Sequence, residues 1–275
     1  MKYVDVRGAR IRYHETGDEA APPVVLLHGI GRSLEDWSAQ HPLLEDTHRV
    51  ISIDLPGFGL SQRLPEPTTL PLLADAAWAT LDALGEKRPV HLMGNSMGGA
   101  VSMRMLADEP GRVATMTLVS SAGFGKEVTF ALRMLAVPGL GKPLLGRIDR
   151  RTAPRVERTL FASRAMVTPE RVAMAIKIAR QPDFIACYLE IARALGGLRG
   201  VAAGWRGELL PLVADCAKPT LLVWGDRDRI LPATHLAAAR AALPSAQWHI
   251  FPRTGHMPQI ERPEEFAALV RPLLA

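Results

Sequence analysis

The fold of this chain is decided by residues 90–100, which read VHLMGNSMGGA. An apolar run typical of a buried strand ends at Gly94, and the small residues after Ser96 predict a helix over 97–107. Glycines on both sides of the serine permit a tight strand-to-helix turn that exposes its side chain at the end of a sheet. We therefore interpret Ser96 as a nucleophile. The backbone N–H of Met97, at the start of the helix, is a candidate donor to a developing oxyanion.

A nucleophilic serine needs a base and an acid, and in the architecture that this turn suggests the acid precedes the histidine. A buried-strand pattern over 219–225 leads into a loop that places Asp228 at its carboxyl end, with Asp226 as a nearby alternative. A further strand expected over 246–251 is followed by Gly255 and His256. We predict that His256 is the general base and that Asp228 orients its imidazole.

A second amide donor is expected in the loop after an apolar run at residues 24–28. The loop reads His28-Gly29-Ile30-Gly31, and a turn that exposes backbone N–H groups suits an oxyanion hole formed by Ile30 and Met97. His28 itself is interpreted as a structural residue, hydrogen-bonded beneath the turn. The residues beside these groups are expected to contact the substrate: Gly29, Asn95 and Met257.

Five motifs in this order resemble the α/β-hydrolase family, and the resemblance covers nearly the whole chain. They read LHGIG at 27–31, DLPGFGLS at 54–61, GNSMGG at 94–99, WGDRD at 224–228 and GHMP at 255–258. The resemblance implies an α/β fold with a mostly parallel eight-stranded sheet, helices on both faces and a helical cap inserted after strand six. In that family the acid can instead follow the sixth strand. Here that position reads Ser120-Ser121, so Asp228 has no obvious rival there.

The pattern of strands predicts where the cap lies. A hairpin is expected over 2–6 and 11–14, and further strand-like runs lie at 50–54 and 114–120. The interval 124–208 lacks a convincing strand, so we predict a core domain of residues 1–123 and 209–275 and a cap of 124–208.

The predicted cap carries fifteen Lys and Arg against seven Asp and Glu, whereas the whole chain has a net charge of +5. Two interpretations of this basic excess are open. It attracts an anionic substrate or a lipid surface toward the pocket, or it is the solvated face of amphipathic helices. An apolar run from Met134 to Leu145 is expected to close over an acyl group.

Composition narrows the class of protein. With 275 residues and 48% hydrophobic residues, the chain is large and apolar enough to bury a large core without disulfides or metals. Its two cysteines, Cys187 and Cys216, lack metal-ligand spacing, which favours reduced thiols and a cytoplasmic location. No apolar segment has membrane-spanning length. Nothing pairs the basic residues with a nucleic-acid-binding motif. We expect a small-molecule substrate, no cofactor, no metal and no nucleic acid, and we leave a homodimer open.

Two enzyme functions and one non-catalytic function follow from these motifs. The leading hypothesis is hydrolysis of carboxylic esters with hydrophobic or aromatic acyl groups through an acyl-enzyme. The alternative is C–C bond hydrolysis of dienol ring-cleavage products, because the GNSMGG elbow resembles those enzymes and a basic lid suits anionic substrates. Two departures disfavour it, since those enzymes have a Gly-Pro-Gly extension near Ile30 and a Trp where this chain has Met257. A non-catalytic receptor on the same fold is the third hypothesis.

Overall fold

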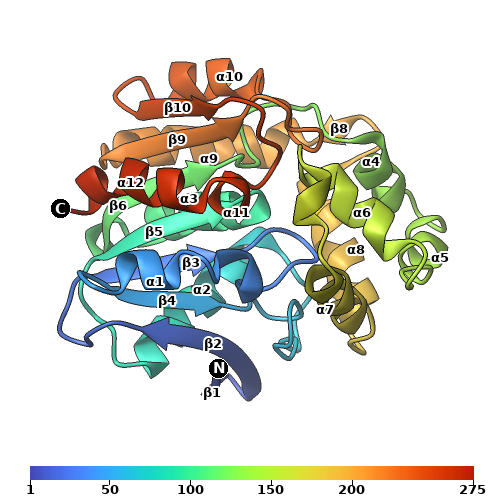
Figure 1. Ribbon diagram of the computed structural model, residues 1–275, viewed down its shortest axis with the longest axis horizontal. Coiled ribbons are helices and arrows are strands. Elements are labelled where there is room, and N and C mark those ends of the chain that lie inside the picture. The colour runs from blue at the N-terminus through green and yellow to red at the C-terminus, as the bar shows by residue number, and fades with distance from the viewer.

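A computed structural model describes residues 1–275 and contains one eight-stranded sheet (Figure 1). Its spatial order is β1-β2-β4-β3-β5-β6-β9-β10, with antiparallel pairing of β1 with β2 and of β2 with β4 and parallel pairing elsewhere. The strands are β1 (Lys2–Val6), β2 (Ala9–Thr16), β3 (Pro23–Leu27), β4 (Arg49–Ile53), β5 (Val90–Asn95), β6 (Val113–Val119), β9 (Thr220–Gly225) and β10 (Gln247–Phe251). The predicted fold is confirmed, and the six runs expected as parallel strands lie within one residue of the observed bounds.

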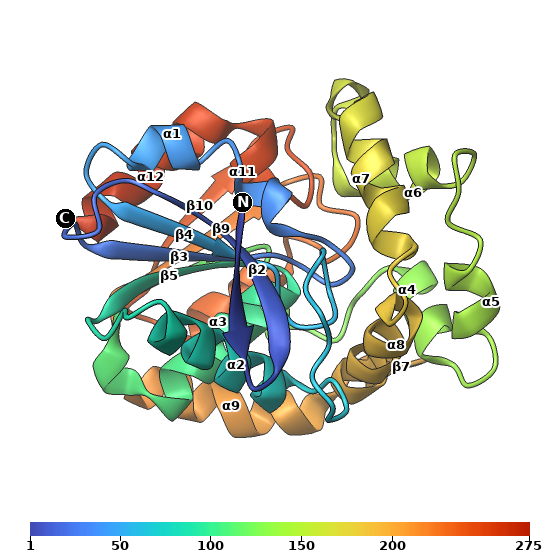
Figure 2. The same cartoon turned by 90° about the horizontal axis from the view of Figure 1, so that it is seen from below.

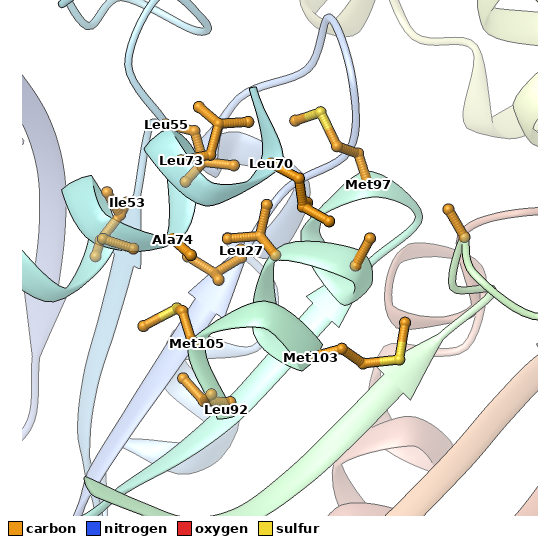
Figure 3. Close-up of a cluster of buried hydrophobic side chains, with 14 of the residues drawn as sticks. Leu27, Ile53, Leu55, Leu70, Leu73, Ala74, Leu92, Met97, Met103 and Met105 are labelled. Carbon is orange, nitrogen blue, oxygen red and sulfur yellow. The ribbon is translucent and has the colours of Figure 1, made fainter. Parts of the chain in front are cut away.

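The central strands are buried on both faces, which explains their continuous apolar sequences. Along β3 successive side chains alternate between two hydrophobic clusters: Val25 and Leu27 join the larger, and Val24 and Leu26 the smaller. Figure 3 shows part of the larger cluster, in which Leu27 lies among side chains of the helices that follow β4 and β5. The sheet is thus fixed in register by burial on both sides.

Helices cover both faces of the sheet. In Figure 2, α2, α3 and α9 lie below the sheet, whereas α1, α11 and α12 lie above it. The helices beside the sheet are α1 (His41–Leu44), α2 (Leu70–Ala83), α3 (Met97–Asp108), α9 (Ala203–Asp215), α10 (His235–Ala242), α11 (Pro258–Glu261) and α12 (Pro263–Leu274), with short 3₁₀ helices at Leu34–Trp37 and Pro110–Arg112. A third 3₁₀ helix, Arg164–Met166, lies between β6 and β9 in the sequence. The helix predicted over 97–107 corresponds to α3, which extends one residue further, to Asp108.

A separate helical layer lies between β6 and β9 in the sequence and beside one end of the sheet in space (Figures 1 and 2). It contains α4 (Phe130–Ala136), α5 (Gly141–Leu145), α6 (Ala153–Leu160), α7 (Pro169–Ala179), α8 (Phe184–Leu195) and a two-stranded ribbon of β7 (Gly196–Gly197) and β8 (Gly200–Val201). The ribbon was not expected from the sequence. The predicted boundary at 208/209 falls within α9, which packs against α3 of the core. None of the helices is both long and apolar enough to cross a bilayer.

Candidate active site

Ser96 lies on a strained turn between β5 and α3. Its backbone has φ 57°, a left-handed conformation that is rare for residues other than glycine and costs about 1–3 kcal/mol. The turn is held by Ser96 N–H donating to Val119 O at 3.0 Å and by Ala122 N–H donating to Ser96 O at 3.1 Å. A Cβ on Gly98 would lie 2.2 Å from the Leu27 carbonyl oxygen, so glycine is required for the helix to approach β3. The sequence pattern thus forms the tight turn that it predicted.

Asp228 and His256 form a buried pair. The Nδ1 atom of His256 lies 2.7 Å from Asp228 Oδ2, and the Asp228 side chain is 0% exposed. The other carboxylate oxygen accepts hydrogen bonds from the backbone N–H groups of Ile230 at 2.8 Å and Leu231 at 3.0 Å. Because a carboxylate can only accept here, Nδ1 carries the proton and Nε2 has the free lone pair that a general base needs.

Asn95 brings this pair to the serine turn. Its side-chain amide donates to the backbone oxygen of Val119 at 3.1 Å and to that of His256 at 3.0 Å. His256 is therefore tied to the residue that directly precedes Ser96. The structure contains no hydrogen bond between Ser96 Oγ and His256 Nε2, a contact that often forms only when substrate is bound. Asp226 does not contact the imidazole, since its Oδ1 accepts from the Thr254 N–H at 3.1 Å.

Two backbone amides beside Ser96 have no acceptor within the protein. The N–H of Met97 is the first of α3, and the N–H of Ile30 lies in the loop after β3, and neither donates a hydrogen bond. Ile30, Ser96 and Met97 line the same cavity. The helix start adds partial positive charge at that point. These amides are placed where an oxyanion next to Ser96 could accept from both.

The residues expected to contact substrate occupy other positions. Asn95 is buried below the cavity and bonds the two carbonyls just described. Gly29 lies against the serine, since a Cβ there would be 3.2 Å from Ser96 Cβ. Met257 is 0% exposed and packs in a small cluster with Phe161 and Ile260. None of these three lines the cavity, so their contact with a substrate stays a prediction.

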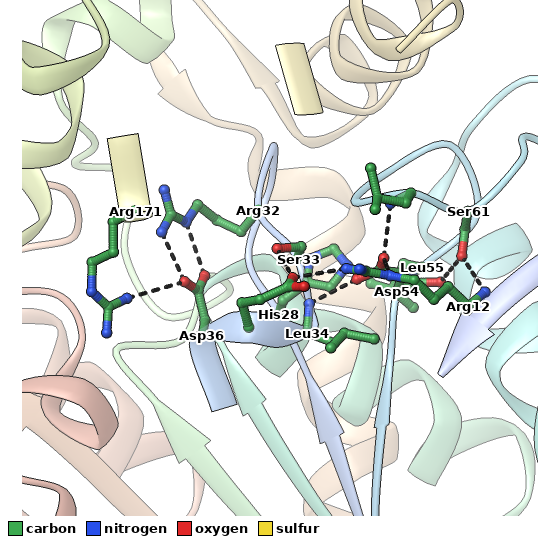
Figure 4. A network of polar contacts seen from close by, with 12 residues as sticks. Arg12, His28, Arg32, Ser33, Leu34, Asp36, Asp54, Leu55, Ser61 and Arg171 are labelled. Atoms are coloured by element: carbon green, nitrogen blue, oxygen red, sulfur yellow. Dashed lines mark hydrogen bonds and ion pairs between the residues drawn. The ribbon is translucent and has the colours of Figure 1, made fainter. Parts of the chain in front are cut away.

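His28 supports the loop that carries Ile30. Its Nδ1 contacts the Gly29 carbonyl at 2.7 Å, and its Nε2 accepts the Leu55 N–H at 3.0 Å. Complete burial lowers the pKa of His28, which keeps the imidazole neutral and fits one donating and one accepting nitrogen. Figure 4 shows the same loop beside the buried Asp54 carboxylate, which accepts from Arg12 Nε at 2.6 Å and from the Leu34 N–H at 2.7 Å. The loop that carries Ile30 thus rests on a buried polar network.

An arginine of this loop, Arg32, shares Asp36 with Arg171 of α7 (Figure 4) and joins the core to the helical layer through Glu157. Arg32 follows Gly31 and binds both oxygens of Asp36, with Nε–Oδ2 at 2.9 Å and Nη2–Oδ1 at 2.7 Å. Its Nη1 binds Glu157 of α6, whose side chain is 0% exposed. Arg171 of α7 approaches Asp36 to 3.9 Å. This buried cluster therefore connects α6 and α7 directly to the loop of Ile30.

The cavity above Ser96 is mostly apolar. Sixteen residues line it, of which eleven are hydrophobic. They are Ile30, Ser96, Met97, Ala122, Val128, Leu132, Arg133, Ala136, Ala192, Leu195, Gly196, Gly197, Gly200, Val201, Ile230 and Leu231. Core loops and the helical layer thus contribute together, and Arg133 is the one charged lining residue.

The residues that the helical layer contributes to the cavity were not identified from the sequence. The apolar run expected to cover an acyl group, Met134 to Leu145, contributes only Ala136 to the lining. The lining instead uses Leu132, Arg133 and Ala136 of α4, of which Leu132 and Ala136 are four residues apart and share a helix face. That spacing indicates a shared helix face in the sequence. Because α4 is only seven residues long, however, the tertiary packing is needed to identify the face that meets Ser96.

Comparisons with known proteins agree with this architecture. A 2-hydroxy-6-oxononadienedioate/2-hydroxy-6-oxononatrienedioate hydrolase of Pseudomonas sp is 30% identical over 268 residues, covering 94% of this chain and 89% of that protein. A dihydrolipoyllysine-residue acetyltransferase component of an acetoin cleaving system from Cupriavidus necator is 32% identical over 272 residues, covering 98% of this chain. The chain spans about two thirds of the length of that relative, 68%.

A solved structure and a family profile extend the likeness to the whole chain. A meta-cleavage product hydrolase from Pseudomonas fluorescens IP01 superposes with a TM-score of 0.82 at 24% identity, covering 99% of this chain and 97% of the other, which shows the shared fold. The profile described as alpha/beta hydrolase fold matches residues 22–263. The chain therefore belongs to the α/β-hydrolase fold family and is a hydrolase of that family.

Proposed function

We propose that this protein hydrolyses carboxylic esters with hydrophobic or aromatic acyl groups, with Ser96 as nucleophile, His256 as general base and Asp228 as its orienting acid. The observation that supports this most strongly is the Asp228–His256 bond at 2.7 Å, tied through Asn95 to a serine on a strained turn. The bond leaves Nε2 as the free nitrogen of the base. A strained turn that exposes a serine hydroxyl is the arrangement that nucleophilic attack requires.

The proposed reaction has two halves. Ser96 Oγ attacks the ester carbonyl carbon while its proton passes to His256 Nε2, and the resulting oxyanion accepts from the N–H groups of Ile30 and Met97. Collapse breaks the ester C–O bond, and the alcohol leaves with the proton from Nε2. Water then attacks the acyl-enzyme and gives its proton to Nε2. The acid leaves as that proton returns to Ser96 Oγ.

We also propose that residues 124–208 act as a cap that covers the cavity. Residues of α4, α8 and the β7–β8 ribbon line the cavity together with Ser96, and the Arg32–Glu157 pair anchors α6 to the core. The apolar lining supports a hydrophobic group on the substrate. The free cysteines, Cys187 and Cys216, fit the cytoplasmic location that we propose.

C–C bond hydrolysis is the second candidate, and one observation favours it. The Pseudomonas relative that is 30% identical is named as a hydrolase of a dienedioate and a trienedioate. The same serine, histidine and amide donors serve such a reaction, because a carbonyl is attacked and an oxyanion forms. The position after His256 is Met257, which has no aromatic ring. Its side chain is buried beside Phe161 and does not line the cavity.

The test combines covalent labelling with turnover. We expect a fluorophosphonate probe to label the protein, 4-nitrophenyl esters of increasing acyl length to be hydrolysed, and Ser96→Ala to abolish both. Ser245→Ala, at an exposed serine outside the site, should leave both unchanged. No labelling of the wild type would refute the nucleophile. Turnover of a ring-fission dienoate but of no ester would replace the ester function by the C–C function.

A further inference from the structure

Arg133 is the single charge in an otherwise apolar wall. It lies on α4, is half-buried, and lines the cavity together with Ser96 and the oxyanion residues Ile30 and Met97. Its helix neighbours in the lining, Leu132 and Ala136, are apolar. An ion placed among apolar side chains loses hydration, so it is unfavourable unless an opposite charge accompanies it. A guanidinium at this position therefore calls for an anionic partner.

No carboxylate of the protein provides that partner. The Nε atom of Arg133 donates to the Val128 carbonyl at 3.0 Å, and the side chain takes part in no ion pair. The nearest acidic residue in the sequence, Glu127, binds His235 Nε2 at 3.2 Å instead. Arg32 offers the contrast, because Asp36 and Glu157 occupy its donors. Arg133 is thus oriented by one backbone bond while both of its terminal nitrogens lack a protein acceptor.

We propose that Arg133 binds a carboxylate of the substrate, so that the preferred substrates are half-esters of dicarboxylic acids. One carboxyl group would be the ester attacked by Ser96, and the other would be the free carboxylate on Arg133. A planar guanidinium with two free N–H₂ groups matches a carboxylate in a bidentate geometry. The apolar lining between these two ends selects a hydrocarbon spacer. This inference rests on the proposed ester hydrolysis and names the substrate class within it.

The experiment compares charged and neutral esters of the same length. Mono-4-nitrophenyl esters of C4 to C8 dicarboxylic acids are assayed beside 4-nitrophenyl esters of the unbranched monocarboxylic acids. We expect wild-type kcat/KM to favour the charged series at one chain length by about tenfold or more, since a charge-assisted pair is strengthened by the low dielectric of the cavity. Arg133→Gln should remove that preference, lowering kcat/KM for the half-ester by about tenfold to a hundredfold more than for the neutral ester of the same length.

Two further variants make the result specific. Arg133→Lys keeps the charge without the fork and should retain part of the preference. Arg155→Gln removes an exposed arginine of α6 that has no charged partner, and should leave both series unchanged. This control separates local binding from attraction by the basic cap as a whole.

The outcomes separate this inference from the function on which it rests. If the wild type hydrolyses neutral esters with no preference for half-esters, or if Arg133→Gln keeps the preference, the carboxylate site is refuted and ester hydrolysis stands. If the wild type is not labelled by fluorophosphonate and turns over neither series, the proposed function itself fails. Neutral-ester turnover by each variant reports that it is folded, and the wild-type preference tests the site without any variant.

Discussion

Replacing Glu157 with alanine tests whether α6 holds the oxyanion loop. In the wild type, Glu157 is 0% exposed and binds Arg32 Nη1, while Asp36 takes the other side of the guanidinium. The substitution therefore removes one of two carboxylates from a buried cation. The remaining pair keeps Arg32 from becoming an isolated buried charge.

The magnitude follows from that geometry. Breaking a buried ion pair by removing one partner costs about 3–5 kcal/mol when the other charge is left alone. Asp36 remains on Arg32 at 2.7 and 2.9 Å, so the loss is closer to that of one charged hydrogen bond, about 1.5–3 kcal/mol. Glu157 Oε2 has no partner in the wild type, which offsets part of the loss. We expect Glu157→Ala to lower the free energy of unfolding by about 2 kcal/mol and Glu157→Gln by about half as much.

Urea unfolding followed by tryptophan fluorescence gives the free energy, and limited proteolysis shows whether residues 124–208 open first. The control is Glu208→Ala, at an exposed glutamate of α9 without a charged partner, which should change stability by less than about 0.5 kcal/mol. A Glu157→Ala protein as stable as this control would refute the reasoning. Unchanged protease sensitivity of 124–208 would show that the pair does not hold the cap.

Three other perturbations follow from the contacts of buried groups. Burial lowers the pKa of His41 to about 3 and of His91 to about 4, so the unfolded chain binds more protons below about pH 6.5 and stability should fall by up to about 1.4 kcal/mol per pH unit for each. Between pH 7 and pH 5, the urea midpoint of His91→Asn should fall less steeply than that of the wild type. Parallel falls in the two proteins would contradict this prediction. Gly98→Ala places a Cβ 2.2 Å from a backbone oxygen and should lower the free energy of unfolding by more than about 3 kcal/mol. The added Cβ of Gly111→Ala meets nothing within 4 Å, so thermal unfolding should show little change in the stability of that variant. Asn95→Ala should lower kcat about tenfold or more with little change in KM, because the amide positions the base without lining the cavity; a rise in KM alone would favour direct substrate contact.

The centre of the sheet was predictable because its central strands are buried on both faces and are bounded by glycine-rich turns. Such strands read as continuous apolar runs, and β5 and the turn at Ser96 lie where the sequence places them. The Asp228–His256 contact was predicted for a related reason. Parallel strands end at the same edge of a sheet, so residues that follow β9 and β10 lie close together. The sequence pattern therefore predicts most of the core and the contact between Asp228 and His256, the acid and base that we propose.

The helical layer of residues 124–208, which we propose to be a cap, was less predictable, because its helices meet the core through single faces. The ribbon β7–β8 has two strands of two residues each, three glycines and one valine, which give no strand pattern. Only its packing against Lys126 reveals it. The apolar run from Met134 to Leu145 has the composition of a lid, yet its neighbours Leu132 and Arg133 line the cavity. Composition cannot distinguish these residues, because a rotation of one short helix exchanges which of them face the core.

The basic excess of residues 124–208 is visible in the sequence, but the effect of each charge depends on its position in the structure. Counted together, these charges suggest attraction of anions over the whole cap, which falls off over about 10 Å at ordinary ionic strength. Their positions differ in effect: Arg171 approaches Asp36, Arg155 is exposed to solvent, and Arg133 lines the cavity without a carboxylate partner. A screened surface charge raises the encounter rate of any anion, whereas we propose that the half-buried guanidinium of Arg133 distinguishes one substrate from another. Added salt should therefore weaken the half-ester preference less than it slows the encounter, which places selectivity in the cavity and not on the surface of the cap.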